Sequence, residues 1–155
     1  MWVNGYTIRP GSDLLSADLM GTNLSRVDLS GANLVNAILI GANLRGANLS
    51  GAMLNSIVAS GADFSGANLS GATLGYATLQ LANFSYANLS GCTFPHADLS
   101  GANLSNANLF DADLRKCDLK GAHTKGVLLR NTKVPEIHAS LFGSSFSSQK
   151  PTETG

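Results

Sequence analysis

A leucine or phenylalanine recurs at every fifth position over most of this chain. Residues 12–136 divide into 25 five-residue units, and the central residue is Leu or Phe in 22 of them. Two positions before it stands Ala in 17 units, and the position between is usually Asp or Asn, so that the unit reads A-(D/N)-L-S-G. A period of five matches neither an α-helical turn of 3.6 residues nor the two-residue period of a long strand. The chain is therefore expected to fold as short extended pieces joined by corners.

The geometry of an extended piece predicts which residues of the unit face inward. The first and third residues of such a piece point to one side and the middle residue to the other. Ala and Leu should therefore form the interior and Asp or Asn the surface, while Ser-Gly makes the corner. At Ile57-Val58-Ala59 the large and small inward residues are exchanged, which keeps the interior volume roughly constant.

A spacing of twenty residues sorts the units into four sets, here called faces I to IV. Their first units are 12–16, 17–21, 22–26 and 27–31, and each face recurs every twenty residues. Face IV ends in Leu-Ser-Gly in four successive units, whereas the last residue of a face I unit is never Gly; a fifteen-residue spacing would mix these classes. The sequence predicts an all-β solenoid with four faces and about six coils stacked about 4.8 Å apart.

Two finer expectations follow from this arrangement. Phe64 and Phe84 lie twenty residues apart and should stack in the interior. Gly51 belongs to a column of glycines and should have a positive φ, as in a type II turn. Ser56 belongs to the glycine-free column of face I, so its corner is expected to be of another type, with a negative φ.

Units such as Ala47–Gly51 and Ala67–Gly71 resemble those of the pentapeptide-repeat family, over about four-fifths of the chain. The resemblance implies a right-handed quadrilateral β-helix, parallel in its pairing, with one unit on each face. The handedness comes from the resemblance alone.

Both ends of a solenoid expose a terminal coil, and both are predicted to be covered. Residues 1–11 form the expected N-terminal cap, before the β-helix of residues 12–136; its apolar residues are Trp2, Val3, Tyr6 and Ile8. Residues 137–155 are expected to hold a short capping helix and a flexible polar tail. That helix should run through Pro135–Phe142 and place Ile137, Leu141 and Phe142 on one side.

No set of residues indicates catalysis, a cofactor or a metal. His96, His123 and His138 lack partners at metal-ligand spacing, and no G-x-S-x-G motif is present. Asp98 and Asp118 lie one coil apart and are interpreted as surface acids rather than an acid/base pair. We therefore expect a protein that is not an enzyme and has no cofactor.

Two other polar sets receive a structural interpretation. Cys92 and Cys117 occupy the small inward position and are expected to be buried, unreactive thiols. One column of face IV contains Asn48, Asn68, Asn88 and Asn108. It is either a binding surface for a regular polymer or a stack of amides that bond to one another, and the second interpretation is favoured.

Eight apolar residues in outward or corner positions belong to the adjacent faces I and II. This apolar patch consists of Leu15, Met20, Val35, Ile38, Ile40, Met53, Val58 and Leu81. An outward apolar cluster is typical of an interaction surface. A ladder of β-branched side chains that only stabilises the faces explains it equally well.

Basic residues are concentrated near the C-terminal end. This basic patch consists of Arg115, Lys116, Lys120, Lys125, Arg130 and Lys133. Residues 1–110 hold three Lys/Arg and five Asp/Glu, a balance of −2, whereas residues 111–155 hold seven and five, a balance of +2. A solvated surface is the favoured interpretation, and a contact for an acidic partner is the alternative.

Composition limits the function further. The formal net charge is zero, which argues against direct binding to nucleic acid. No apolar run is long enough to cross a membrane, and no secretory signal is visible, so a cytoplasmic location is expected.

The leading hypothesis is a structural or protein-binding module, with a protein partner or weak self-association. The resemblance implies an alternative, a DNA mimic that binds a type II topoisomerase such as gyrase, although that role needs a strongly acidic surface.

Overall fold

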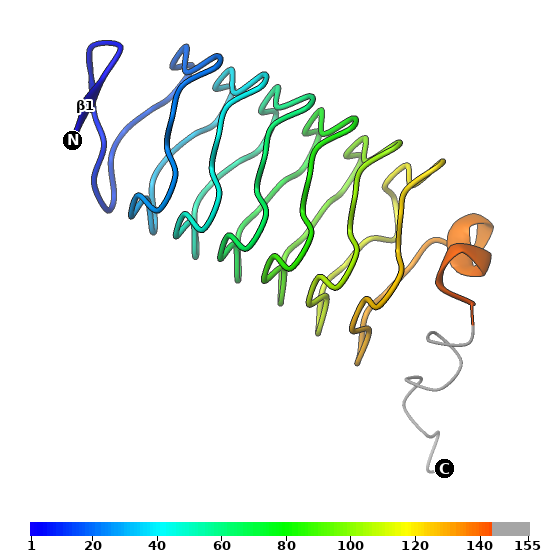
Figure 1. The fold of residues 1–155 in the computed structure, drawn as a ribbon. Helices are drawn as coiled ribbons and strands as arrows, with labels where there is room; N and C mark the ends of the chain where they lie inside the picture. Colours follow the sequence, from blue (N-terminus) through cyan, green and yellow to red (C-terminus); the bar gives the residue numbers. More distant parts are fainter. Residues whose placement is uncertain (144–155) are drawn as a thin grey trace.

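The computed structural model describes residues 1–143, which form a stack of coils along one axis (Figure 1). Parallel bridges join residues twenty positions apart, from Asp13↔Asn33 to Asp113↔Lys133. Each coil carries four such bridges, five residues apart. The predicted four-faced coil with a twenty-residue repeat is therefore confirmed.

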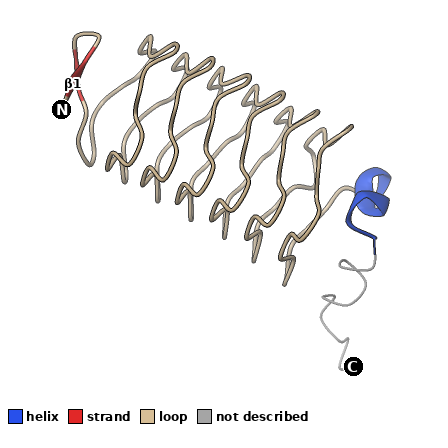
Figure 2. Ribbon diagram, viewed as in Figure 1, coloured by secondary structure: helices blue, strands red, loops and turns tan. Residues whose placement is uncertain are grey.

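Regular elements lie only at the two ends of the described chain. Strands β1 (Trp2–Val3) and β2 (Tyr6–Thr7) form an antiparallel hairpin, and the 3-10 helix η1 spans Glu136–Phe142. Between them the faces are drawn as loops because each bridge is a single residue long (Figure 2). The stability of this middle part comes from its stacking rather than from long strands.

Hydrogen bonds between coils account for most backbone N–H groups of a unit. In unit 47–51, Asn48 N–H donates to the preceding coil at 2.9 Å. Leu49 and Gly51 donate to the following coil at 2.6 and 2.8 Å. The next residue, Ala52, closes the corner by donating to the carbonyl of Leu49 at 3.0 Å. Only the fourth residue of the unit, Ser50, is left without a backbone acceptor.

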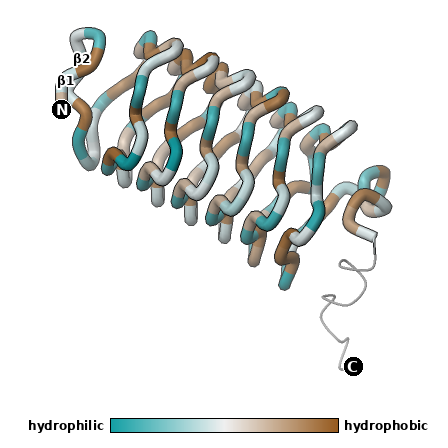
Figure 3. The backbone as a smooth tube through the Cα atoms, in the orientation of Figure 1, coloured by the Kyte–Doolittle hydropathy of each residue, from teal (hydrophilic) through white to brown (hydrophobic). Residues whose placement is uncertain are grey.

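The interior consists of the two inward columns, as predicted. Almost every Ala and Leu in those positions is buried, and so are the exchanged Ile57 and Ala59. Apolar and polar segments alternate along each coil (Figure 3). Phe64 and Phe84 stack with ring centroids 4.8 Å apart and planes 5° apart, which confirms their predicted contact.

The prediction for the corner at Ser56 is wrong. Ser56 has a φ of +59°, close to the +64° of Gly51. The other face I corners Asn36 and Tyr76 have φ values of +60° and +58°. The stacked coils impose one turn geometry on corners of either composition, so the residue type does not select it. A non-glycine residue accepts this left-handed conformation at a cost of about 1–2 kcal/mol.

Replacing a glycine corner with a β-branched residue should reveal this strain. A Cβ atom at Gly51 would meet nothing within 4 Å, so the substitution tests the backbone alone. Gly51→Val is expected to lower the unfolding free energy by about 1–2 kcal/mol, whereas Ser56→Gly should cause no loss. Thermal or urea unfolding measures both, and an unchanged stability of Gly51→Val would contradict the strain.

Part of the apolar set predicted for the N-terminal segment packs against the core. Ile8 is buried, and Val3 and Tyr6 pack partly buried against the core. Trp2 does not take part, because its side chain is 70% exposed.

At the other end, two of the three residues predicted on one side of η1 pack against the core. Phe142 is buried and Leu141 packs against the core, but Ile137 is 84% exposed. The expectation for Ile137 is wrong because a 3-10 helix has three residues per turn, so residues four apart do not share a side. The predicted flexible tail lies outside the described residues, and the division of the chain into three parts stays a prediction.

Candidate functional site

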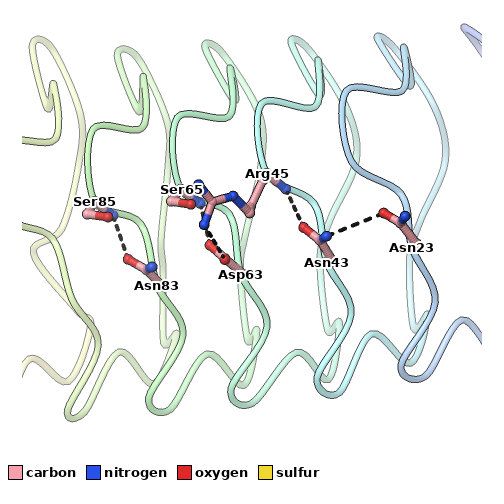
Figure 4. A network of polar contacts seen from close by, with 7 residues as sticks. All are labelled: Asn23, Asn43, Arg45, Asp63, Ser65, Asn83 and Ser85. Atoms are coloured by element: carbon pink, nitrogen blue, oxygen red, sulfur yellow. Dashed lines mark hydrogen bonds and ion pairs between the residues drawn. The ribbon is translucent and has the colours of Figure 1, made fainter.

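The outward Asp and Asn side chains complete the hydrogen bonding of the unit. Each one accepts the N–H of the residue two positions later, as Asn43 does from Arg45 at 3.1 Å and Asn83 from Ser85 at 3.0 Å (Figure 4). This Asx turn provides an acceptor for the one N–H group of the unit that has no backbone acceptor. The repeated Asp or Asn is therefore a structural residue and does not by itself indicate a binding site.

The face IV column is also explained by structure. Asn48 Nδ2 donates to Asp28 at 3.2 Å, Asn68 to Asn48 at 3.5 Å and Asn108 to Asn88 at 3.4 Å. The Oδ1 atoms of these residues additionally accept the Asx-turn bonds, so their acceptors are already used. These contacts support the interpretation of the column as stacked amides.

The apolar patch lies at the surface on faces I and II. Its side chains are exposed or half-buried, and those of Ile38 and Val58 stack at bridged positions. The exposed members are Leu15, Met20, Ile40, Met53 and Leu81. Ile38 and Val58 are a bridged pair on face II, and Met53, bridged to Asn33, lies on the neighbouring face I.

Three members of the patch replace the structural Asp or Asn with an apolar side chain. These are Ile38, Met53 and Val58. Consequently, within residues 1–143 the N–H groups of Ile40, Asn55 and Ser60 have no protein acceptor. Each replacement forgoes a hydrogen bond with a net value of about 1 kcal/mol. A residue that breaks the local rule of its repeat without a visible structural gain points to a role in binding.

Large side chains occupy three consecutive corners of the coil formed by residues 72–91, and only that of Leu81 was predicted to belong to an interaction surface. Tyr76, Leu81 and Tyr86 are 65%, 73% and 71% exposed, and all have φ near +60°. Bulky residues rarely adopt that conformation. The signal was available in the sequence, since Leu81 and Tyr86 stand in columns that contain several glycines.

The basic patch is spread over several faces at the C-terminal end, and all six side chains are exposed. Arg115 is bound to Asp113, with Nε to Oδ1 at 3.0 Å and Nη2 to Oδ2 at 2.7 Å. This guanidinium holds the pKa of the Asp113 carboxyl below its usual value. Arg130 lies over the ring of Phe110, 4.7 Å from its centroid. Two of the six cations are thus engaged within the chain.

A surface pocket of about 540 Å³ lies on face I beside this patch. Its lining consists of Thr93, Pro95, Asp113, Arg115 and Lys116. The hydrogen bonding between coils shifts by one residue there. His96 N–H donates to the carbonyl of Lys116, twenty residues later, whereas Tyr76 N–H donates to the carbonyl of Pro95, nineteen residues later. Since Arg115 is neutralised by Asp113, Lys116 supplies the remaining charge, and the pocket is a weak candidate for anion binding.

The cysteines and histidines are not assembled into a site. Burial raises the pKa of both Cys92 and Cys117 to about 12, and each thiol donates to a backbone carbonyl. His138 Nε2 lies 3.6 Å from Asp118 Oδ1. The His96 ring stacks on that of Tyr76, with the ring centroids 5.0 Å apart. Among residues 1–143, no three His, Cys, Asp or Glu side chains are placed to hold a metal.

No helix within the described part of the chain has the length and apolarity needed to cross a membrane.

The fold defines a class of protein: a four-faced solenoid with one five-residue unit on each face. The family profile for pentapeptide repeats matches in eight copies, over residues 17–56, 48–85, 62–101 and 87–126. The chain belongs to the pentapeptide-repeat family.

Solved structures of other proteins are similar to this chain. HetL, a pentapeptide repeat protein involved in heterocyst differentiation regulation from the cyanobacterium Nostoc sp. strain PCC 7120, is 36% identical over 81% of this chain, with a TM-score of 0.40. The match spans 65% of HetL, just under two thirds of its length.

Two further structures extend the comparison. The pentapeptide repeat protein Rfr23 from the cyanobacterium Cyanothece 51142 is 30% identical over 79% of this chain and 90% of its own, with a TM-score of 0.42. The plasmid-mediated fluoroquinolone resistance protein QnrB1 is 19% identical over 90% of this chain and 95% of its own, also at 0.42. A search of the curated proteins finds no match.

Proposed function

We propose that this protein is a non-enzymatic interaction module, in which a rigid β-helix presents the apolar patch of faces I and II to a protein partner or to a second copy. In this proposal the helix is right-handed, as the family implies, with about six coils, a terminal cap formed by η1 and a cytoplasmic location. The observation that carries the proposal is the replacement of structural Asp or Asn by Ile38, Met53 and Val58.

The competing explanation, a ladder that only stabilises the faces, accounts less well for that observation. A cross-strand contact between β-branched side chains contributes about 0.2–1 kcal/mol. The Asx-turn bond that each replacement forgoes has a net value of about 1 kcal/mol. Stabilisation therefore does not favour Ile38 and Val58 over Asp or Asn, whereas binding does.

The alternative function, mimicry of DNA toward a type II topoisomerase, has less support. The chain has a formal net charge of zero and bears the basic patch on its surface. Duplex DNA carries a negative charge about every 1.7 Å of its axis, which a neutral surface does not imitate.

The double variant Ile38→Asp with Val58→Asn separates the interaction surface from the ladder. Both new side chains supply an Asx acceptor, for Ile40 and Ser60, which offsets the repulsion between the new carboxylate and the bridged Asp18. The unfolding free energy should therefore stay within about 1 kcal/mol of wild type. Association, by contrast, should be lost. Light scattering for self-association and capture of a partner on immobilised protein provide the measurements.

Asn88→Asp is the matched control, since it adds the same charge on face IV between Asn68 and Asn108 and keeps the acceptor atom used by Ser90 and Asn108. It should associate as wild type does. The interface idea fails if the folded double variant associates like wild type, or if wild type is a monomer that binds no partner through this surface.

A further inference from the structure

The order of the outward residues along face II indicates which kind of partner this face binds. This inference rests on the interaction surface proposed above. Bridges connect Asp18, Ile38, Val58, Thr78 and Asp98 in one column along the axis, which continues to Asp118. Apolar side chains thus occupy the centre of the column and a carboxylate stands on each side. Across residues 17–101, face II contains no Lys or Arg.

Two carboxylates of this column, those of Asp18 and Asp98, are not neutralised by the chain. On other faces, Asp63 Oδ2 lies 3.7 Å from Arg45 Nη1, and the Asp113 carboxylate is bound by the Arg115 guanidinium. Within the described residues, Asp18 and Asp98 form no ion pair. Although burial raises the pKa of the Asp98 carboxyl, hydrogen bonds from Ser100 and Gln80 outweigh it and hold that pKa below its usual value. The acidic charge on this face is available to another molecule.

Two corners with positive φ lie beside the column, one coil before Asp98. Tyr76 and Leu81 stand at the two ends of the face II unit that contains Thr78. Leu81 leans over the next coil, where its Cδ2 would lie 2.8 Å from a Cβ atom at Gly101. The other large corner, Tyr76, stacks on His96 at 5.0 Å. Because both side chains are large and exposed, they extend the apolar surface that a partner can cover.

The backbone of face II has no free edge to offer. Ile38 and Val58 donate to the preceding coil at 2.9 and 3.0 Å, and Leu39 donates to the following coil at 2.7 Å. In the two units concerned, only single N–H groups, those of Ile40 and Ser60, are left without an acceptor within the described chain, and they do not form the row of donors and acceptors that a partner strand needs, so recognition must proceed through side chains. An amphipathic helix laid along the surface is the recognition mode that uses side chains alone.

We propose that face II binds a basic amphipathic α-helix of a partner protein, with apolar residues over Ile38 and Val58 and a Lys or Arg near each of Asp18 and Asp98. The dimensions agree. Four bridged steps of about 4.8 Å separate Asp18 from Asp98, about 19 Å in all. About 13 residues of α-helix cover the same length, and its pitch of about 5.4 Å nearly matches the coil spacing.

A second copy of the chain is a poorer occupant of this face. Two face II columns placed together, in either direction, bring carboxylates against carboxylates and supply no cation before Lys120. Like charges opposite one another are destabilising. The column therefore selects a partner of opposite charge.

The test uses a labelled helix-forming peptide with two leucines at i and i+4 in its centre and lysines near both ends, about 13 residues apart. Reference peptides carry Glu for Lys, or the same residues in scrambled order. Binding to the full-length protein is followed by fluorescence anisotropy at several salt concentrations. Only the lysine peptide in its original order should bind, and its affinity should fall as salt is raised.

The variant Asp18→Asn with Asp98→Asn isolates the charge, because Asn occupies the same position in neighbouring columns and retains the Asx acceptor. This variant should weaken binding about tenfold, the combined effect of two exposed ion pairs. Asp28→Asn, the same change on face IV, should bind as wild type does. Ile38→Asn with Val58→Asn, which leaves the charge unchanged, should also lose binding.

The outcomes distinguish this inference from the proposed function. If the Asp18/Asp98 variant binds normally while the Ile38/Val58 variant does not, the interaction surface stands and the basic helix is wrong. If all three peptides bind alike, or none binds, the inference is overturned. The association test with the Ile38→Asp and Val58→Asn variant then decides on the interaction surface by itself.

Discussion

Leu69→Lys is expected to abolish folding or to lower the unfolding free energy by on the order of 5 kcal/mol. The Leu69 side chain is fully buried in the middle of the stack, where an ammonium group has no acceptor and no route to solvent. Burying an unpaired charge is among the most damaging single changes in a protein. Circular dichroism and urea unfolding measure the loss.

The neighbouring residue supplies the control. Asn68 points outward, and its Oδ1 accepts the N–H of Ser70 at 3.0 Å. Asn68→Lys should therefore cost only about 1 kcal/mol, the value of that hydrogen bond. Equal stabilities of the two variants would refute the assignment of inward and outward positions.

Phe84→Ala is expected to cost about 3–5 kcal/mol, because it removes a fully buried ring and leaves a cavity beside Phe64. The rigid stack limits how far neighbouring coils can collapse into that space. Phe110→Ala is the control: Phe110 is half-buried on the surface beneath Arg130, and its loss should cost about 1 kcal/mol or less.

The contact between the two rings is measurable separately. Leucine fills the same column in other coils, so Phe64→Leu and Phe84→Leu are mild replacements. A double-mutant cycle should give a coupling of about 0.5–1.5 kcal/mol for the offset or stacked pair. A coupling near zero would mean that the rings only fill volume.

The coil could be predicted from the sequence because its period and its interior are set by the same residues. The five-residue recurrence of Leu, and the classes that separate at a spacing of twenty, sufficed for the faces and for the contact of Phe64 with Phe84. The corner at Ser56 was predicted wrongly, since its conformation is imposed by hydrogen bonds to other coils rather than by its own side chain. Ile137 was misplaced because the pattern was interpreted at α-helical spacing.

The candidate site could be located but not interpreted from the sequence. Outward apolar residues are visible once inward and outward positions are known. Their significance depends on the Asx-turn bonds that Ile38 and Val58 cannot form. No side-chain pattern reveals which backbone N–H groups lack an acceptor in a neighbouring coil. Likewise, the unpaired state of Asp98 depends on which cations reach it, a distance that folding alone determines.

The twenty-residue bridge has a consequence for how such a chain changes length. Removing residues 62–81 would place Asn83 opposite Asn43, an amide opposite an amide, and every later residue would keep its face. Removing five residues instead would turn everything after the deletion onto the neighbouring face and would detach Asp98 from the column of Ile38 and Val58. Insertions and deletions of whole coils are therefore structurally tolerable, and they alter only the distance between the ends of a binding surface. Length in this architecture varies in steps of one coil.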